Sequence, residues 1–326
     1  MPGISTISLV IPVFHEANQL YKNIYIIKDI LDRHAIRYEI VLVDDGSRDN
    51  TWEVVKKLAG ELAEIRAVRF SRNFGKEAAL CAGLEAASGD ACIIMDADLQ
   101  HPPEIIPQMI SLWKDQGYDI VDGIKASRGK ESFFKKFSAR SFYSVLKKFS
   151  GLDLNNASDF KLLDARVVAA WKTMGERTTF FRGMSAWVGY RRATVPFVVA
   201  ERQEGTSKWS FFHLLKLAVT AITSFSSAPL QLVTFIGVIF LISSIILGIQ
   251  TLYMYFMNIA VTGFTTVILL LLIIGSTLMI SLGIIGTYIA RIFDEVKQRP
   301  RYIVLEKAGY EDVAKKPDIG NTSSGR

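Results

Sequence analysis

The sequence is poor in cysteine. Its two cysteines, Cys81 and Cys92, are neither in a CxxC pair nor beside a histidine. A disulfide scaffold and a cysteine-based metal site are therefore excluded, and we expect two reduced, buried thiols. Half of the residues are apolar and glycine follows no repeat, which excludes a disordered chain and a collagen-like fibre.

Charged residues are missing from one long stretch near the C-terminus. Residues 229–290 contain no Asp, Glu, Lys, Arg or His over 62 residues, although the whole chain has 38 Lys and Arg and 32 Asp and Glu. About 20 consecutive apolar residues suffice to cross a bilayer. The sequence therefore predicts two transmembrane helices, at 229–257 and 264–290, and excludes a fully water-soluble protein.

The flanks of this stretch predict its orientation. Lys208 and Lys216 precede it and four cations follow it within residues 291–301, so the positive-inside rule places both ends in the cytoplasm. The spans contain no ionisable group for an ion path, which favours an anchor over a transporter. The N-terminus has no signal peptide pattern. We expect a multi-pass protein of the cell inner membrane, with the catalytic domain, 1–206, and the tail, 291–326, in the cytoplasm.

The first 124 residues alternate between short apolar runs and amphipathic stretches. This order predicts an α/β fold with a mostly parallel sheet, in which ligands bind at the carboxyl ends of the strands. The expected strands are 7–14, 38–44, 65–71, 91–96 and 118–123, and the expected helices lie near 17–33, 51–63, 76–87 and 104–115.

A strongly basic segment follows at residues 125–150, with eight cations and one acid. Three of the cations share one face of a helix and phenylalanines occupy the opposite face. This pattern predicts an interfacial helix over 132–150 on membrane lipid, not on nucleic acid, and a second one over 207–228. The alternative is an ordinary helix on the domain surface.

Acidic residues end the predicted strands. Asp96 and Asp98 follow one strand, and their carboxylates with the Gln100 amide favour Mg²⁺ or Mn²⁺, which take further ligands from water and phosphates. Asp44 and Asp45 end another strand, where they either accept hydrogen bonds from a nucleobase or ribose or only form a turn. The chain has neither GxGxxG nor GxxxxGK[ST], which argues against a dehydrogenase and a P-loop nucleotidase.

Several motifs resemble family-2 glycosyltransferases, which have a GT-A (Rossmann-like) fold. They are VIPVFHE at 10–16, VDDGS at 43–47, SRNFGK at 71–76 and DADLQHPPE at 96–104. Further motifs narrow the resemblance to polyprenyl-phosphate glycosyltransferases of the bactoprenol glucosyltransferase type, relatives of dolichol-phosphate mannose synthase. They are SDFKL at 158–162, FRG at 181–183, and Glu201-Arg202 with GTSKW at 205–209.

The resemblance implies the roles of individual residues. Asp98 and Asp159 would be catalytic, with Asp159 at the position proposed as the base. Phosphate on the acceptor lipid would bind Lys125, Arg128 and Arg140. The metal and diphosphate would be held by Asp96, Asp98 and Gln100. The nucleotide-sugar would be bound by Pro12, Phe14, Glu16, Val43, Asp45, Asp96, Ala97, Asp98, Gln100, Arg202 and Lys208. Two residues depart from the family pattern, His15 in place of an Asn and Lys125 in place of an Arg. The second replaces a guanidinium, which can donate two parallel hydrogen bonds to a phosphate, with a single ammonium charge.

The resemblance also implies the reaction, an inverting transfer of glucose from UDP-glucose to undecaprenyl phosphate. The phosphate nucleophile is already anionic, so Asp159 either acts as a base or orients a cation or the sugar. Open alternatives are another donor sugar, a processive polysaccharide synthase and a non-catalytic lipid-binding scaffold. Against the synthase, the chain lacks QxxRW and two spans enclose no pore. Family likeness and a tail long enough to reach a neighbouring copy predict a homo-oligomer, with a tetramer as the candidate state.

Overall fold

The computed structural model describes residues 5–125, 158–177, 179–198, 226–257 and 263–310. Most of the two predicted interfacial helices, all of 132–150 and residues 207–225, lies outside these ranges. All five predicted strands and all four predicted helices are present, which confirms the α/β order of the first part of the chain.

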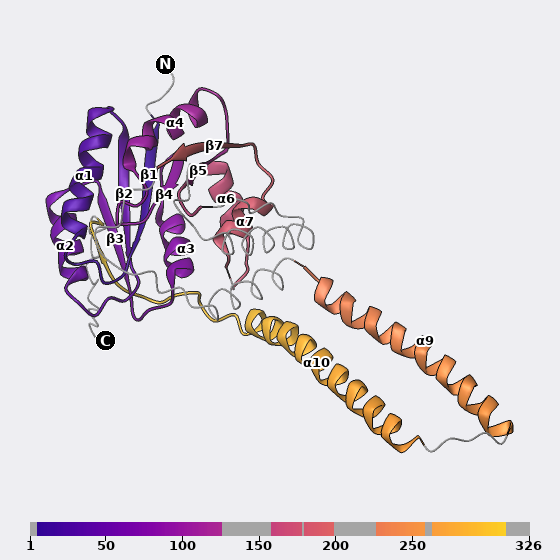
Figure 1. Ribbon diagram of the computed structural model, residues 1–326. Coiled ribbons are helices and arrows are strands. Elements are labelled where there is room, and N and C mark those ends of the chain that lie inside the picture. The colour runs from indigo at the N-terminus through magenta and orange to yellow at the C-terminus, as the bar shows by residue number, and fades with distance from the viewer. Residues whose placement is uncertain (1–4, 126–157, 178, 199–225, 258–262, 311–326) are drawn as a thin grey trace, which may run out of the picture.

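The domain is built on one sheet of eight strands (Figure 1). In chain order they are β1 (Thr6–Val13), β2 (Arg37–Asp44), β3 (Ile65–Phe70), β4 (Ala91–Ile94), β5 (Ile120–Lys125), β6 (Lys161–Asp164), β7 (Arg192–Phe197) and β8 (Val304–Ala308). Their spatial order is β7-β5-β6-β4-β1-β2-β3-β8. Strands β4, β1, β2 and β3 are mutually parallel, as are β5 and β7, whereas β6 and β8 pair antiparallel with their neighbours.

Alternation along β1 divides the core into two layers. Leu9 and Ile11 are fully buried on one face of the sheet with α1 and α2, and Val10 is fully buried on the other face with α3. Because successive strand residues point to opposite faces, a continuous apolar run is what a sheet covered on both sides needs. The helices are α1 (Leu20–Arg33), α2 (Thr51–Glu61), α3 (Lys76–Ala86), the 3-10 turn η1 (Pro103–Ile105), α4 (Ile106–Lys114), α6 (Ala165–Thr173) and α7 (Phe181–Trp187).

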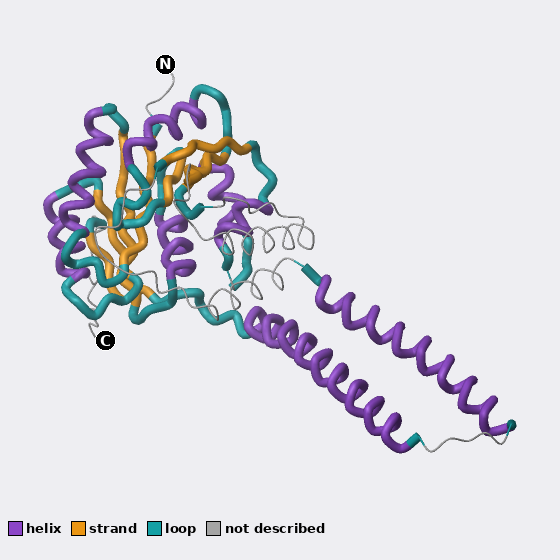
Figure 2. Tube along the Cα trace, viewed as in Figure 1, coloured by secondary structure: helices purple, strands orange, loops and turns teal. Residues whose placement is uncertain are grey.

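Two long helices extend away from the sheet domain side by side (Figures 1 and 2). They are α9 (Ala228–Phe256) and α10 (Phe264–Val296), of 29 and 33 residues. At 1.5 Å per residue each exceeds the ~30 Å hydrocarbon core of a bilayer. Both are long and apolar enough to cross a membrane, and their apolar windows are not buried within the protein.

The chain after α10 returns to the sheet, which the sequence analysis did not predict. Residues 297–308, called the C-terminal strap here, end in β8, which pairs with the edge strand β3. Tyr302 stacks on Phe70 with ring centroids 4.7 Å apart, and Glu306 accepts a hydrogen bond of 2.7 Å from Trp52 Nε1. The strap thereby covers an otherwise unpaired sheet edge, a position at which strands are prone to unwanted pairing.

Candidate active site

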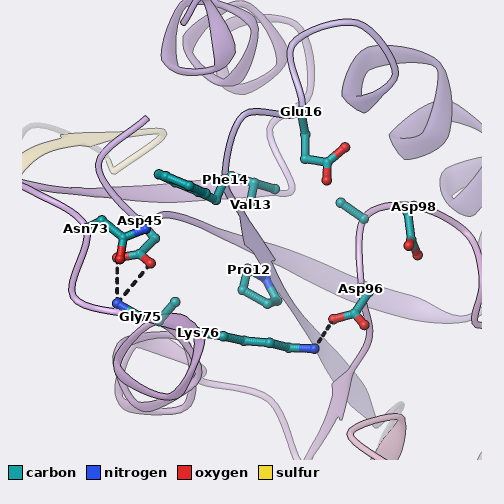
Figure 3. A pocket seen from close by; sticks show the side chains of 12 residues that line it. Pro12, Val13, Phe14, Glu16, Asp45, Asn73, Gly75, Lys76, Asp96 and Asp98 are labelled. Carbon is teal, nitrogen blue, oxygen red and sulfur yellow. Dashed lines mark hydrogen bonds and ion pairs between the residues drawn. The ribbon is translucent and has the colours of Figure 1, made fainter. Parts of the chain in front are cut away.

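A cleft of about 340 Å³ opens at the carboxyl ends of the central strands. Residues from the end of β1, the β2 end, the start of α3 and the loop after β4 line it (Figure 3). In the close-up, Asp45 lies beside Gly75 on one side and Asp96 meets Lys76 on the other. The lining residues are Pro12, Val13, Phe14, Glu16, Asp45, Asn73, Gly75, Lys76, Ala79, Asp96, Ala97 and Asp98.

Backbone amides hold the Asp45 side of the cleft. The Asp45 carboxylate accepts hydrogen bonds from Phe74 N at 2.7 Å and from Gly75 N at 3.0 Å. Burial raises the pKa of Asp45, and these two hydrogen bonds oppose the rise. Gly75 has φ of 99°, which a residue with a side chain rarely adopts. The glycine is therefore what lets the chain turn its amide toward Asp45 and begin α3.

Two loop residues of this edge have left-handed backbone conformations, His15 with φ of 57° and Leu99 with φ of 56°. Such strained conformations concentrate at functional sites. His15 stacks on Phe14 at 4.0 Å and its Nε2 accepts a hydrogen bond from Arg48 N. Asn and His are both enriched at such φ values, so His15 adopts the conformation that an Asn would, with its own contact to the loop.

The acidic residues near Asp96 fit a hard divalent cation. Burial raises the pKa of Glu16, and the charges of Asp98 and Asp96 raise it further, which marks a region of negative potential. Among the described residues no three His, Cys, Asp or Glu side chains already form a metal cage. A pair of carboxylates suits Mg²⁺ or Mn²⁺, because these ions take oxygen ligands, keep waters and bind substrate phosphates. The residues that would hold the ion are Asp96 and Asp98, with Gln100 beside them.

A network of charges adjoins the other side of the cleft, where Lys76 and Asp96 line it. Lys76 Nζ lies 2.6 Å from Asp96 Oδ1 and 3.0 Å from Asp159 Oδ2. Arg182 forks onto Asp159, with Nε donating to Oδ1 at 2.7 Å and Nη2 to Oδ2 at 3.0 Å. Burial favours a higher pKa for Asp159, but Arg182 and Lys76 outweigh it and hold the pKa well below its usual range. Two neighbouring cations thus favour the ionised form of Asp159.

His101 shapes the loop after β4. Its Nδ1 accepts a hydrogen bond of 3.2 Å from Asp96 N, and its ring stacks on Phe160 at 4.9 Å. Burial lowers the pKa of His101, which agrees with a neutral ring whose Nδ1 is an acceptor. The side chain is buried, so its contact with the Asp96 backbone is its evident role.

The structure brings most of the predicted site residues together. Pro12, Phe14, Glu16, Asp45, Asp96, Ala97 and Asp98 line the cleft, and Asp159 joins it through Lys76. Val43 is fully buried in the core one residue before the strand ends, and Gln100 follows Asp98 outside the lining set. Lys125 ends β5 and is exposed. Arg128, Arg140, Arg202 and Lys208 lie outside the described residues.

Sequence reasoning missed the partners of Asp159. Lys76 stands in the SRNFGK motif, where contact with the nucleotide and capping of a helix are both open, and Arg182 stands in the FRG motif with no assigned role. Glu77 follows Lys76 directly but stands outside every motif of the sequence. Only the fold places α3, α7 and the segment before β6 around one point.

Known proteins resemble this chain over nearly its whole length. The family model of glycosyl transferase family 2 matches residues 8–166. The uncharacterized glycosyltransferase YkcC of Bacillus subtilis is 36% identical over 307 residues, covering 94% of this chain and 95% of YkcC. The bactoprenol glucosyl transferase of Shigella phage SfII is 38% identical over 303 residues, covering 91% and 97%.

A solved structure is similar to part of this chain at low identity. The mannosyltransferase PcManGT of Pyrobaculum calidifontis, in complex with GDP-Man and Mn²⁺, is 19% identical with a TM-score of 0.45, over 68% of this chain and 64% of that one. The close relatives and the family match, together with the described sheet, confirm the predicted GT-A type of α/β fold. The chain belongs to glycosyltransferase family 2 and is a glycosyltransferase of that family.

Proposed function

We propose that the protein transfers a hexose, glucose from UDP-glucose, to the phosphate of a polyisoprenyl phosphate such as undecaprenyl phosphate. The observation that carries the proposal is the chain of ion pairs in which Lys76, which lines the cleft, joins Asp96 to Asp159 and so to Arg182. The cleft thus offers carboxylates for a metal–diphosphate beside cations for a second phosphate. The relatives named bactoprenol glucosyl transferase support the acceptor class and the sugar.

The donor would lie along the cleft from Asp45 to Asp98. Phe14 is 41% exposed, which leaves its ring available to a base, and Asp45 offers carboxylate oxygens beside it. A divalent cation held by Asp96, Asp98 and Gln100 would neutralise the diphosphate as it leaves. Charge that grows on the leaving group in the transition state is what fixed cations stabilise. Arg202 and Lys208 are proposed to add to that stabilisation.

Asp159 is proposed to orient cations and not to act as a base. Both of its oxygens already accept hydrogen bonds from Arg182, and one also contacts Lys76. A phosphate oxygen of the acceptor carries negative charge at neutral pH and needs no deprotonation. Asp159 would hold Arg182 and Lys76 beside the reacting groups. Because the acceptor phosphate would attack the anomeric carbon directly, the configuration of that carbon would be inverted.

The membrane would carry the acceptor. The exposed apolar surfaces of α9 and α10 support two spans, with both ends and the catalytic domain on the cytoplasmic face. Lys125, Arg128 and Arg140 are proposed to receive the lipid phosphate near the membrane. We propose a homo-oligomer, with a tetramer as the candidate state. The mass of the protein in mild detergent tests this proposal, and a monomeric mass would contradict it.

The reaction is tested with the full chain in detergent. Undecaprenyl phosphate and Mg²⁺ or Mn²⁺ are supplied with UDP-glucose, UDP-N-acetylglucosamine or GDP-mannose, and the lipid product is detected by mass spectrometry. We expect a glucosylated lipid from UDP-glucose alone, lost with EDTA and in Asp98→Ala. Because both carboxylates are needed to hold the cation, we expect Asp98→Ala to lower turnover at least about 100-fold.

Each other outcome overturns a defined part of the proposal. Product from another donor contradicts the sugar, and product in EDTA contradicts the metal. No product from any donor, by protein that still binds nucleotide and undecaprenyl phosphate vesicles, favours the lipid-binding scaffold.

A further inference from the structure

Helix α7 carries Arg182, and two charged side chains from other elements contact it. Glu77 Oε2, from the first turn of α3, accepts a hydrogen bond of 2.8 Å from Phe181 N, the first residue of α7. Lys161 Nζ, from β6, donates to Ser185 Oγ at 2.7 Å and lies 5.1 Å from the centroid of the Phe181 ring. The short helix is therefore fixed at its start and along its side.

These contacts converge on the backbone of Arg182. Ser185 Oγ donates to Arg182 O at 3.0 Å, while Glu77 contacts the amide of the preceding residue. Phe181 is fully buried, so this end of α7 cannot shift without opening the core. Lys161 is itself fully buried and also lies 3.2 Å from Asp122 Oδ1, which ties the support to the sheet. The backbone of Arg182 is thus held through the amide of Phe181 before it and through its own carbonyl group.

Glu77 is joined to the cleft through its neighbour. Lys76 precedes it on α3 and contacts Asp96 and Asp159, so one helical turn supports both the carboxylates and the helix that carries Arg182. A misplacement of about 1 Å in such a constellation can cost about 100-fold in rate. Glu77 itself does not line the cleft.

We propose that Glu77 is a positioning residue, which fixes the start of α7 and thereby the Arg182 guanidinium against Asp159. The expected change in kcat rests on the proposed function, whereas the expected change in hydrogen exchange of α7 does not. The property that matters is the oxygen that accepts the Phe181 amide, which a glutamine also offers.

The test compares Glu77→Ala and Glu77→Gln with the unchanged chain. Glu53→Ala is the control, because Glu53 likewise lies in the first turn of a helix, α2, but its side chain is exposed. Hydrogen–deuterium exchange of peptides covering α7 reports the hydrogen bond directly. Steady-state transfer from UDP-glucose to undecaprenyl phosphate gives kcat and the donor KM, and titration with UDP gives the nucleotide affinity.

In Glu77→Ala we expect faster exchange in α7 and a kcat lower by about 10-fold to 100-fold, with donor KM and UDP affinity within about 2-fold. Glu77→Gln is expected to restore slow exchange and to keep kcat within about 3-fold. Unchanged exchange in Glu77→Ala, an equal loss in both variants, or a parallel loss of UDP affinity would each overturn the positioning role. If the unchanged chain transfers no sugar, the proposed function fails, and the exchange result alone decides the role of Glu77.

Discussion

The two sides of the site, called the Asp45 wall and the Asp159 wall here, are held in place by different kinds of chemical group. On the Asp45 wall, the carboxylate is held by backbone amides of Phe74 and Gly75, and its pKa is raised by burial. On the Asp159 wall, the carboxylate is held by the side chains of Arg182 and Lys76, and its pKa is held low. One wall is shaped by the main chain, and the other is held together by ion pairs between side chains.

Because of this difference, we expect the two walls to serve different steps of the reaction, substrate binding and group transfer. Backbone amides at a turn cannot be rearranged without refolding the turn, so the Asp45 wall suits recognition of a constant group such as a nucleoside. Side-chain ion pairs can exchange partners when a metal and phosphates arrive, so the Asp159 wall suits the step in which charge moves. Variants on the two walls should therefore affect different kinetic constants.

The largest effect is expected from Asp159→Asn on the charged wall. The substitution leaves Arg182 and Lys76 without their shared anion, so we expect kcat to fall at least about 100-fold while UDP affinity is retained. Transfer assays and UDP titration measure the two quantities. Asp29→Asn is the matched control, because Arg33 forks onto Asp29 on the exposed face of α1. Near-normal turnover in Asp159→Asn would mean that the two walls do not differ in this way.

A smaller effect, on a different constant, is expected from Asp45→Asn. An asparagine offers one acceptor oxygen where the carboxylate offers two, so the loop bearing Phe74 and Gly75 loosens. We expect the donor KM to rise about 10-fold with kcat within about 2-fold. A fall in kcat at constant KM would contradict the assignment of this wall to nucleotide binding.

The smallest effect concerns Lys76, which contacts Asp96 on the metal side. Removing a positive charge beside a carboxylate that would bind a cation should tighten that cation by about 5-fold in Lys76→Gln. Titration with Mn²⁺ followed by electron paramagnetic resonance measures this without any turnover. Lys57→Gln, on the exposed face of α2, is a control that should leave the titration unchanged. Weaker Mn²⁺ binding in Lys76→Gln would show that Lys76 supports the ion.

The parts of the fold that the sequence predicts are those with strong local patterns. Strands β1 to β5 are apolar runs between amphipathic helices, and the carboxylates after β1, β2 and β4 fall at one sheet edge by topology alone. Asp45, Asp96 and Asp98 could therefore be placed together before any coordinates.

The remainder depends on contacts between distant segments. Strand β6 has four residues and β8 is largely exposed, so neither shows a periodic pattern that predicts a strand. Glu77 meets Phe181 across 104 positions and Arg182 meets Asp159 across 23. No spacing rule links such pairs, because tertiary packing and not local propensity brings them together.

The C-terminal strap has a consequence for how the substrates meet. Only seven residues, 297–303, separate the end of α10 from β8, and a fully extended stretch of that length spans at most about 25 Å. Tyr302 and Arg301 are held to the domain within this stretch, by Glu85 and by the Met174 carbonyl, which shortens the free length further. With α10 in a bilayer, the domain becomes a tethered body that never leaves the membrane surface. The proposed lipid acceptor would then reach the domain by diffusion within the plane of the membrane, whereas a water-soluble donor would reach it from the surrounding solution.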